Sequence, residues 1–352
     1  MKKHLLLVVN PGSSSTKMAL FEDESEIRSD IIRYESHSLQ RFATVWDQYE
    51  FRLHRVREWA HTMTQELSAV VAIGGLLRPL PGGTYRVNER MLEDARGNLQ
   101  GEHASNLGCA MAHSLAREFS CEAFVVDPVS VDELGPLARY SGHPLIQRSS
   151  LSHTLNIHAA ARRAAREMGV PVDETSFVIA HLGSGISVAP VQAGRIIDIN
   201  DASSDGPFSP ERTGGLPLQQ FITLCFSGSY SQQEVRSLVM GKGGLFAYLG
   251  TNSSREVEDR INRGDDEARS VYEAMAYQIA KEIGAMATVL EGDVRAIILT
   301  GGLAGSNLLV DWIMDRVKFI APVLVYAGQD EMNALAAGAL RVLRCETQAL
   351  EY

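Results

Sequence analysis

Residues 5–21, LLLVVNPGSSSTKMALF, are two apolar segments joined by a glycine and serine turn, a pattern that predicts a β-hairpin. Residues 177–199, FVIAHLGSGISVAPVQAGRIIDI, repeat this pattern and add a third strand after a second turn. A weaker echo pairs AVVAIGGLL (69–77) with RAIILTGGLAGSN (295–307), each an apolar strand that ends in a glycine pair. Two halves built in this way predict a duplicated α/β domain.

Helical periodicity fills much of the chain between these strands. The predicted helices cover residues 152–169, 265–292 and 330–343. We expect an N-terminal domain over residues 1–150 and a C-terminal domain over 151–334, with the last helix, about 335–352, crossing back to the first domain.

Composition limits the class of protein. The chain has 352 residues, of which 45% are apolar and 22% are charged, as is usual for globular proteins with a sizeable core. No apolar run reaches the roughly 18 residues of a membrane span, so we expect no membrane contact. The net charge of −10 argues against a nucleic-acid partner. The four cysteines are far apart in sequence, which disfavours zinc and disulfides and suits the cytoplasm.

The stretch NPGSSSTK (10–17) has the composition of a phosphate-binding loop. A P-loop would need a second glycine before its lysine and a long helix after it, whereas only MALF precedes the acidic turn EDESE (22–26). The hairpin turn is therefore preferred, and such turns can aim successive N–H groups at an anion. A polar turn without any ligand is the alternative that this motif leaves open.

Three further motifs could complete a nucleotide site. HLGSGIS (181–187) is a second hairpin turn, which could clamp the β- and γ-phosphates from the other side. GPFSPERTGGLP (206–217) is a non-helical loop that carries Arg212, and ILTGGLAGSNLLVDWI (298–313) is a strand, glycine turn and helix. Taken alone, His181 could be a packed core histidine and Arg212 could pair with a nearby acid.

The order of these motifs resembles the acetate and sugar kinase/Hsp70/actin superfamily and, within it, the short-chain fatty acid kinases of the acetokinase family, the butyrate kinases most of all. The motifs that carry the resemblance run nearly end to end: NPGSSSTK, LLRPLPGGTYRVN, GEHASNLG, VDPVSVDEL, HLGSGIS, DGPFSPERTGGLP, GKGGLFAYLGTN, EAMAYQIAKEIGAMA, LTGGLA and FIAPVLVYAG. The resemblance implies two ribonuclease H-like (actin-like ATPase) domains with a cleft between them. It also implies reversible, ATP- and Mg²⁺-dependent phosphorylation of butyrate to butyryl phosphate, and by analogy a homo-oligomer.

The resemblance also implies roles for individual residues. Those expected at the transferred phosphoryl group are Lys17, Asp127, His153 and Arg212. The metal is expected on Asp127 and Glu331. Phosphate and nucleotide contacts are expected from Asn10, Ser13, Ser15, His181, Gly183, Gly185, Gly301, Gly302 and Gly305.

This sequence departs from the family pattern at two positions. Ile73 stands before the glycine pair 74–75, where we expect an arginine that grips the substrate carboxylate, and we expect Arg78 to take over that role. Gln329 stands where an acid is expected, which makes the register of Glu331 less secure.

Two alternatives remain at this point. Isobutyrate or another short acid could be the preferred substrate, because one methylene group in an apolar pocket changes binding by only about 1–3 kcal/mol. A non-catalytic, actin-like nucleotide-binding switch is the second alternative, and Ile73 is the residue that favours it.

Overall fold

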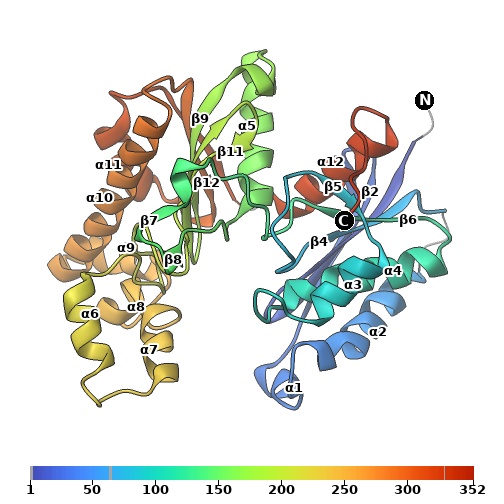
Figure 1. Ribbon diagram of the computed structural model, residues 1–352, viewed down its shortest axis with the longest axis horizontal. Coiled ribbons are helices and arrows are strands. Elements are labelled where there is room, and N and C mark those ends of the chain that lie inside the picture. The colour runs from blue at the N-terminus through green and yellow to red at the C-terminus, as the bar shows by residue number, and fades with distance from the viewer. Residues whose placement is uncertain (1–2, 63–65, 329) are drawn as a thin grey trace. The chain divides into compact units, whose positions relative to one another are not determined.

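The computed structural model describes residues 3–62, 66–328 and 330–352. The chain divides into two compact units (Figure 1). Unit 1 comprises Met1–Asp132 and Asp330–Tyr352, and unit 2 comprises Glu133–Gln329. Among the helices described in both units, none is long and apolar enough to cross a lipid bilayer.

Unit 1 is built on a six-stranded sheet with the order β3-β2-β1-β4-β6-β5. Its strands are β1 Leu5–Pro11, β2 Ser15–Glu22, β3 Ser25–Arg33, β4 Ala69–Ile73, β5 Thr84–Arg86 and β6 Glu122–Val126. The β1–β2 hairpin is antiparallel, whereas β1, β4 and β6 run parallel. The predicted N-terminal hairpin is confirmed, and no long helix follows its turn.

Helices cover both faces of this sheet (Figure 1). They are α1 Ser36–Gln40, α2 Tyr49–Ala60, α3 Glu89–Arg96, α4 Leu107–Glu118 and α12 Glu331–Leu343, with short 3₁₀ turns at Trp46–Gln48 and Ala104–Asn106. Leu5, Leu7 and Val9 pack with α4 in one core cluster, while the alternate residues Leu6 and Val8 are equally buried. Helix α12 also contacts β1, so the central strand is buried on both sides and has no polar face.

Unit 2 repeats this arrangement with a five-stranded sheet of order β11-β10-β9-β12-β13. Its strands are β9 Ser176–Leu182, β10 Ile186–Gln192, β11 Arg195–Ile196, β12 Ala296–Gly301 and β13 Val323–Ala327. In both units the first strand pairs antiparallel with the second and parallel with the fourth. The duplication predicted from the sequence is therefore confirmed.

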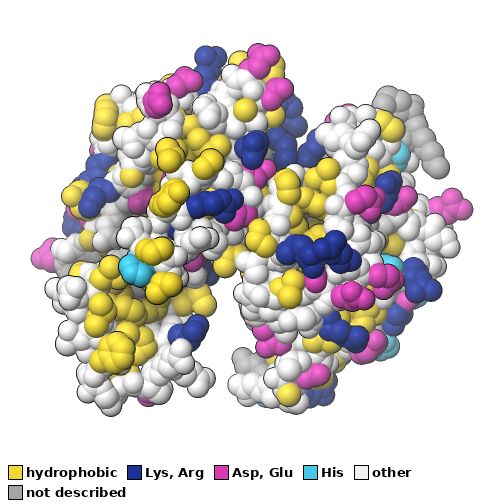
Figure 2. Space-filling view, in the orientation of Figure 1, with side chains coloured by type: hydrophobic (Ala, Val, Ile, Leu, Met, Phe, Trp, Pro, Cys, Tyr) yellow, Lys and Arg dark blue, Asp and Glu magenta, His cyan; other side chains and the backbone are white. Residues whose placement is uncertain are grey.

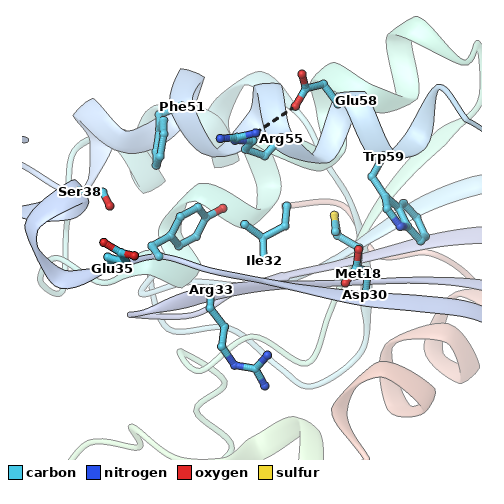
Figure 3. Close-up of a pocket in the computed structure, with 11 residues that line it drawn as sticks. Met18, Asp30, Ile32, Arg33, Glu35, Ser38, Phe51, Arg55, Glu58 and Trp59 are labelled. Atoms are coloured by element: carbon cyan, nitrogen blue, oxygen red, sulfur yellow. Dashed lines mark ion pairs between the residues drawn. The ribbon is translucent and has the colours of Figure 1, made fainter.

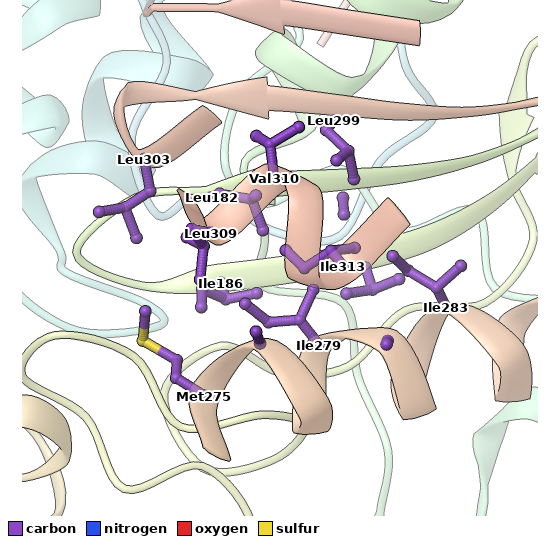
Figure 4. Close-up of a cluster of buried hydrophobic side chains, with 14 of the residues drawn as sticks. Leu182, Ile186, Met275, Ile279, Ile283, Leu299, Leu303, Leu309, Val310 and Ile313 are labelled. Atoms are coloured by element: carbon purple, nitrogen blue, oxygen red, sulfur yellow. The ribbon is translucent and has the colours of Figure 1, made fainter. Parts of the chain in front are cut away.

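The remaining elements of unit 2 flank this sheet. They are the two-stranded sheet β7 Tyr140–His143 and β8 Ile146–Gln147, the helices α5 Thr154–Met168, α6 Leu218–Cys225, α7 Gln232–Val239, α8 Gly244–Leu249, α9 Ser254–Asn262, α10 Asp266–Val289 and α11 Asn307–Val317, and 3₁₀ turns at Leu137–Arg139, Val172–Glu174 and Gly302–Gly305. Helices α10 and α11 bury their apolar stripes against β9, β10 and β12, as Figure 4 shows for Ile279, Ile283 and Ile313. Helix α5 contributes to a separate core cluster with Phe177 and Ile179.

An exposed apolar surface lies on unit 2. Figure 2 shows hydrophobic side chains gathered at the lower left, where Figure 1 places α6, α7 and α8. Leu218, Ile222 and Phe226 are among the large apolar residues exposed there. Patches of this kind often mark interaction surfaces. The homo-oligomer expected by analogy stays a prediction.

The contact-based boundary falls after Asp132, earlier than the domain boundary expected near residue 150. The segment between these positions bonds to unit 2: Gly135 N donates to Ile197 O at 2.8 Å, and Arg148 Nη2 donates to Ile199 O at 2.8 Å. Contacts between residues far apart in sequence determine this boundary, and the composition of the chain does not indicate such contacts. The chain returns to unit 1 at Asp330, just before α12.

Two helical glycines provide a matched test of packing. A Cβ added at Gly338 in α12 would lie 2.4 Å from Val126 Cγ1, whereas one added at Gly284 in α10 would meet no atom within 4 Å. Because overpacking costs about 1–3 kcal/mol and Gly to Ala in a helix gains about 1, we expect Gly338→Ala to destabilise unit 1 and Gly284→Ala to stabilise unit 2. Thermal unfolding of both variants checks this. Equal shifts in the same direction would contradict the described packing of α12 on β6.

Candidate active site

The first group of predicted site residues lies around the β1–β2 turn of unit 1. Asn10 and Lys17 are directly opposite each other in the antiparallel register, and Gly12 N donates to Ser15 O at 2.8 Å to close the turn. Ser13 and Ser14 at its tip are exposed. The turn therefore presents the side chains of two serines to solvent.

Glu331 joins this turn from the other end of the chain. It is the first residue of α12, and its Oε2 accepts hydrogen bonds from Asn10 Nδ2 at 2.8 Å and from Lys17 Nζ at 3.3 Å. The structure thus brings Glu331 to two predicted residues, Asn10 and Lys17, that are each more than 300 positions away in sequence. Gln329, the other residue noted in this segment, lies outside the described residues.

Asp127 follows β6 directly and has an unusual backbone. Its φ is +40°, and its side chain is 1% exposed. Asp127 N donates to Gly83 O at 2.9 Å, and Asp127 Oδ1 accepts from Gly83 N at 2.7 Å. A non-glycine residue held at positive φ costs about 1–3 kcal/mol, and such strain gathers at functional sites.

Arg78 contacts a different set of residues. Its Nε donates to Asp94 Oδ2 at 2.6 Å, its Nη2 pairs with the same carboxylate, and Tyr352 Oη donates to Asp94 Oδ2 at 2.9 Å. Ile73 is the last residue of β4. Within the described part of the chain, Arg78 pairs with Asp94 and Tyr352, neither of which is a predicted site residue.

The second group lies at the β9–β10 turn of unit 2. A Cβ at Gly185 would lie 2.5 Å from Arg212 Nη1, so the glycine lies directly against the guanidinium, which would have to shift to admit a side chain. Ser209 Oγ donates to Ser184 O, which fastens the Arg212 loop to the turn. The predicted turn and the predicted arginine loop are therefore in contact.

The charge of Arg212 is only partly satisfied. Its Nη1 donates to Ala202 O at 3.0 Å, but its buried Nε has no hydrogen-bond partner among the described residues. Burial lowers the pKa of Arg212, while Glu211 and Asp201 raise it by a smaller amount. Because a guanidinium nevertheless stays protonated, this loop carries a partly desolvated cation, which suits an anionic ligand.

Two histidines stack beside this turn. The ring centroids of His153 and His181 are 4.4 Å apart, and His153 Nδ1 lies 2.9 Å from Ser187 Oγ. His181 is 1% exposed, and burial lowers its pKa to about 4. His181 is therefore neutral at pH 7 and packs against His153 without adding a second positive charge.

Glycines line the end of β12. Gly301 has φ +93°, and a Cβ there would lie 2.4 Å from Leu182 O at the end of β9. Gly302 and Gly305 in the next 3₁₀ turn face open space. Because Gly302 and Gly305 carry no side chains, they leave room for the close approach of a flat ring or ribose. Their contact with the adenosine stays a prediction.

No group of three or more His, Cys, Asp or Glu residues that could hold a metal occurs in the described ranges. The donor set still suits Mg²⁺, because this ion keeps several waters and commonly binds one or two carboxylates together with substrate phosphates. Asp127 and Glu331, both in unit 1, are the predicted metal carboxylates, and this assignment stays a prediction.

A cavity of about 440 Å³ lies elsewhere in unit 1, between β2, β3 and α2. Figure 3 shows Asp30 and Arg33 on the strand side and Arg55 and Glu58 on the helix. None of its lining residues is a predicted site residue, but Tyr34, which lines it, donates from its N to Ser14 O of the β1–β2 turn at 2.9 Å.

Sequence analysis missed the residues that hold the predicted ones in place. Asn200 is fully buried; its Oδ1 accepts from Val188 N at 2.6 Å and its Nδ2 donates to Ile186 O at 2.9 Å, which ties the loop before Arg212 to β10. Asp94 was missed as the partner of Arg78. Side-chain contacts between distant segments leave no local pattern that could have identified them.

The sheet order, the two hairpins and the glycine turn define an actin-like ATPase fold. Acetate kinase from Porphyromonas gingivalis has the same fold, with a TM-score of 0.78 and 18% identity over 97% of this chain and all of that one. The family model of the acetokinase family matches residues 144–334. Two curated relatives are similar over nearly the whole chain: "Probable butyrate kinase 2" of Caldanaerobacter subterraneus subsp. tengcongensis is 51% identical, covering 96% of this chain and 97% of that protein, and "Butyrate kinase 2" of Clostridium acetobutylicum is 47% identical, covering 99% of each. The chain belongs to the acetokinase family.

The low pKa of His181 predicts an acid-sensitive unit 2. Unfolded His181 takes up a proton near pH 6.5, whereas the folded residue does so only near pH 4, so its contribution to stability is lost as the pH falls through this window. From pH 6.5 to 5 we expect wild type to lose roughly 1–2 kcal/mol more than His181→Gln. Calorimetric unfolding at both pH values checks this, with exposed His143→Gln as the control that behaves like wild type. An equal loss in wild type and His181→Gln would contradict the neutral buried state.

Proposed function

We propose that this protein transfers the γ-phosphoryl group of ATP to a short aliphatic carboxylate, with butyrate as the preferred substrate. The products are butyryl phosphate and ADP, and the reaction is reversible. The observation that carries this proposal is the identity of 51% and 47%, over nearly full length, to two proteins named as butyrate kinases.

The reaction needs little acid–base chemistry. A carboxylate is already ionised at neutral pH, so one of its oxygens can attack the γ-phosphorus without a general base. The oxygen–phosphorus bond to the carboxylate forms as the bond to the β-phosphate oxygen breaks, and ADP leaves with that electron pair. The protein has to align the two groups and neutralise charge on the transferred phosphoryl.

Arg212 and Lys17 are the cations that we assign to this phosphoryl group. The buried Nε of Arg212 has no partner among the described residues, so a phosphoryl oxygen would satisfy it. His153 is assigned to the same group, held by its contacts with Ser187 and His181. Preorganised donors of this kind stabilise transition-state charge because they need no rearrangement during the reaction.

The nucleotide is assigned to backbone-rich segments. Asn10, Ser13 and Ser15 would bind its phosphates from the first hairpin turn, and the Gly183–Gly185 segment with His181 would do so from the second. Gly301, Gly302 and Gly305 would line the adenosine. Bound Mg²⁺, held through Asp127 and Glu331, would neutralise phosphate charge.

Arg78 remains our candidate for the substrate carboxylate. Asp94 already accepts hydrogen bonds from its guanidinium, so the substrate would have to share this cation with Asp94. This competition with Asp94 and the presence of Ile73 both favour an alternative function. In that alternative the protein is a nucleotide-binding switch that hydrolyses ATP slowly, whether or not a carboxylic acid is present.

Hydroxamate trapping of acyl phosphate tests the proposed function. With ATP and Mg²⁺, we expect product from butyrate and isobutyrate, less from propionate and valerate, and least from acetate. The difference between butyrate and isobutyrate measures the branched-acid alternative directly. If the protein binds ATP tightly but forms no hydroxamate with any acid, the kinase proposal is refuted and the nucleotide-binding switch is favoured instead.

Arg78→Ala, measured on the same acids, tests the carboxylate assignment. We expect its kcat/KM for butyrate to fall at least tenfold while the KM for ATP stays within about twofold, because only one substrate loses a contact. Asp94→Asn is the matched variant, which frees Arg78 from its carboxylate partner and should not raise the KM for butyrate. A change of less than a few fold in Arg78→Ala would remove Arg78 from the site.

A further inference from the structure

Arg52 is a fully buried arginine in the first turn of α2, which begins at Tyr49. It is 1% exposed and is among the largest of the completely buried side chains in the described ranges. Arginine is rarely buried to this extent unless an acid pairs with it. No carboxylate forms an ion pair with Arg52 among the described residues, so its burial calls for another explanation.

The guanidinium of Arg52 binds the β1–β2 turn of unit 1 (Gly12–Ser15) through the carbonyl groups of the turn. Its Nη1 donates to Gly12 O at 2.8 Å and to Ser15 O at 3.2 Å, and its Nη2 donates to Ser13 O at 3.1 Å. Three of the carbonyl groups between β1 and β2 therefore converge on one side chain. Charge-assisted hydrogen bonds of this kind are stronger than neutral ones.

Two further residues fix the orientation of the guanidinium. Gln48 Oε1 accepts from Arg52 Nε at 3.0 Å and from Arg52 Nη2 at 2.9 Å. The Tyr34 ring lies 4.7 Å from the guanidinium carbon, and Tyr34 Oη donates to Thr16 Oγ1 at 3.0 Å. These contacts with Gln48 and Tyr34 restrict rotation of the guanidinium while it binds the turn carbonyls.

This arrangement sets the direction of the N–H groups of the turn. All described peptide bonds are trans, and in a trans peptide the C=O and N–H groups point in opposite directions. Because the carbonyls of Gly12 and Ser13 point to Arg52, the N–H groups of Ser13 and Ser14 point away from it, on the turn whose serine side chains are exposed. Successive N–H groups that point to the same side of a turn can form an anion-binding concavity.

The positive charge of Arg52 supports the same conclusion. Burial lowers the pKa of Arg52, but an arginine remains protonated at neutral pH. A buried cation without an acidic partner is costly, and it adds positive potential directly beneath the turn. Both effects favour a phosphate on the exposed side.

We propose that Arg52 is a positioning residue for nucleotide binding: it holds the Gly12–Ser15 carbonyls so that the N–H groups of the turn face the phosphates of ATP. This inference rests on the proposed function for the identity of the ligand. It assigns no contact between Arg52 and the nucleotide.

Arg52→Lys and Arg52→Met test the proposal. A lysine keeps the charge but has one nitrogen, which cannot reach all three carbonyls, so we expect the KM for ATP to rise about fivefold; for methionine we expect about tenfold or more. The KM for butyrate should stay within about twofold in both variants. The Kd for ADP, measured by calorimetry, should rise in parallel with the KM for ATP.

Arg57→Met is the matched control on the same helix. Arg57 donates to Glu118 at 2.8 Å and is partly exposed, so neither KM should change. If folded Arg52 variants lose thermal stability but keep the wild-type Kd for ADP, Arg52 is only structural and the proposal is overturned. If both variants fail to fold, Gln48→Leu, which releases Nε but keeps the charge, must raise the Kd for ADP, and an unchanged value overturns the proposal.

The ADP measurement also separates this inference from the proposed function. Wild type that binds ADP but forms no acyl phosphate would refute the kinase, while the effect of Arg52 on the Kd for ADP would still support the positioning role. Wild type that is active, with an unchanged Kd for ADP in the folded variants, would refute the positioning role alone.

Discussion

A tight turn can bind phosphate only if its N–H groups face outward, and something must then bind the carbonyl groups that face the other way. Arg52 does this in unit 1, where three turn carbonyls converge on its guanidinium. The turn of unit 2 is supported differently: Ser209 Oγ donates to Ser184 O, and the Arg212 guanidinium packs against Gly185. The duplicated fold thus carries two comparable turns with different supports.

The two ends of the chain meet in unit 1. Helix α12 packs on the sheet through Gly338, which lies against Val126, and this packing carries Glu331 to Asn10 and Lys17. Lys17 and Glu331 neutralise one another in this pair, which is partly buried. The geometry of the first turn therefore depends on the last helix. The local sequence of neither segment indicates that the two are in contact.

Local patterns predicted much of this fold. Both hairpins, the long helix α10 and the strand and glycine turn at β12 follow from periodicity and glycine placement, because each is determined by neighbouring residues. Strand β3, SEIRSDIIR, was missed because it is largely exposed and lacks apolar alternation. The contacts of Arg52, Asn200 and Asp94 could not be predicted, since each joins distant segments. The positions of Asn10, Lys17 and Glu331 were expected by resemblance, but their mutual hydrogen bonds required the structure.

The central claim is that a carboxylate oxygen attacks the γ-phosphorus of ATP. Butyrate labelled with oxygen-18 in its carboxylate, followed by phosphorus NMR of the product, tests this most directly. We expect butyryl phosphate whose phosphorus signal carries the isotope shift of one bridging oxygen-18, with no shift in ADP. Unlabelled phosphate released from ATP, or product without the isotope shift, would contradict it.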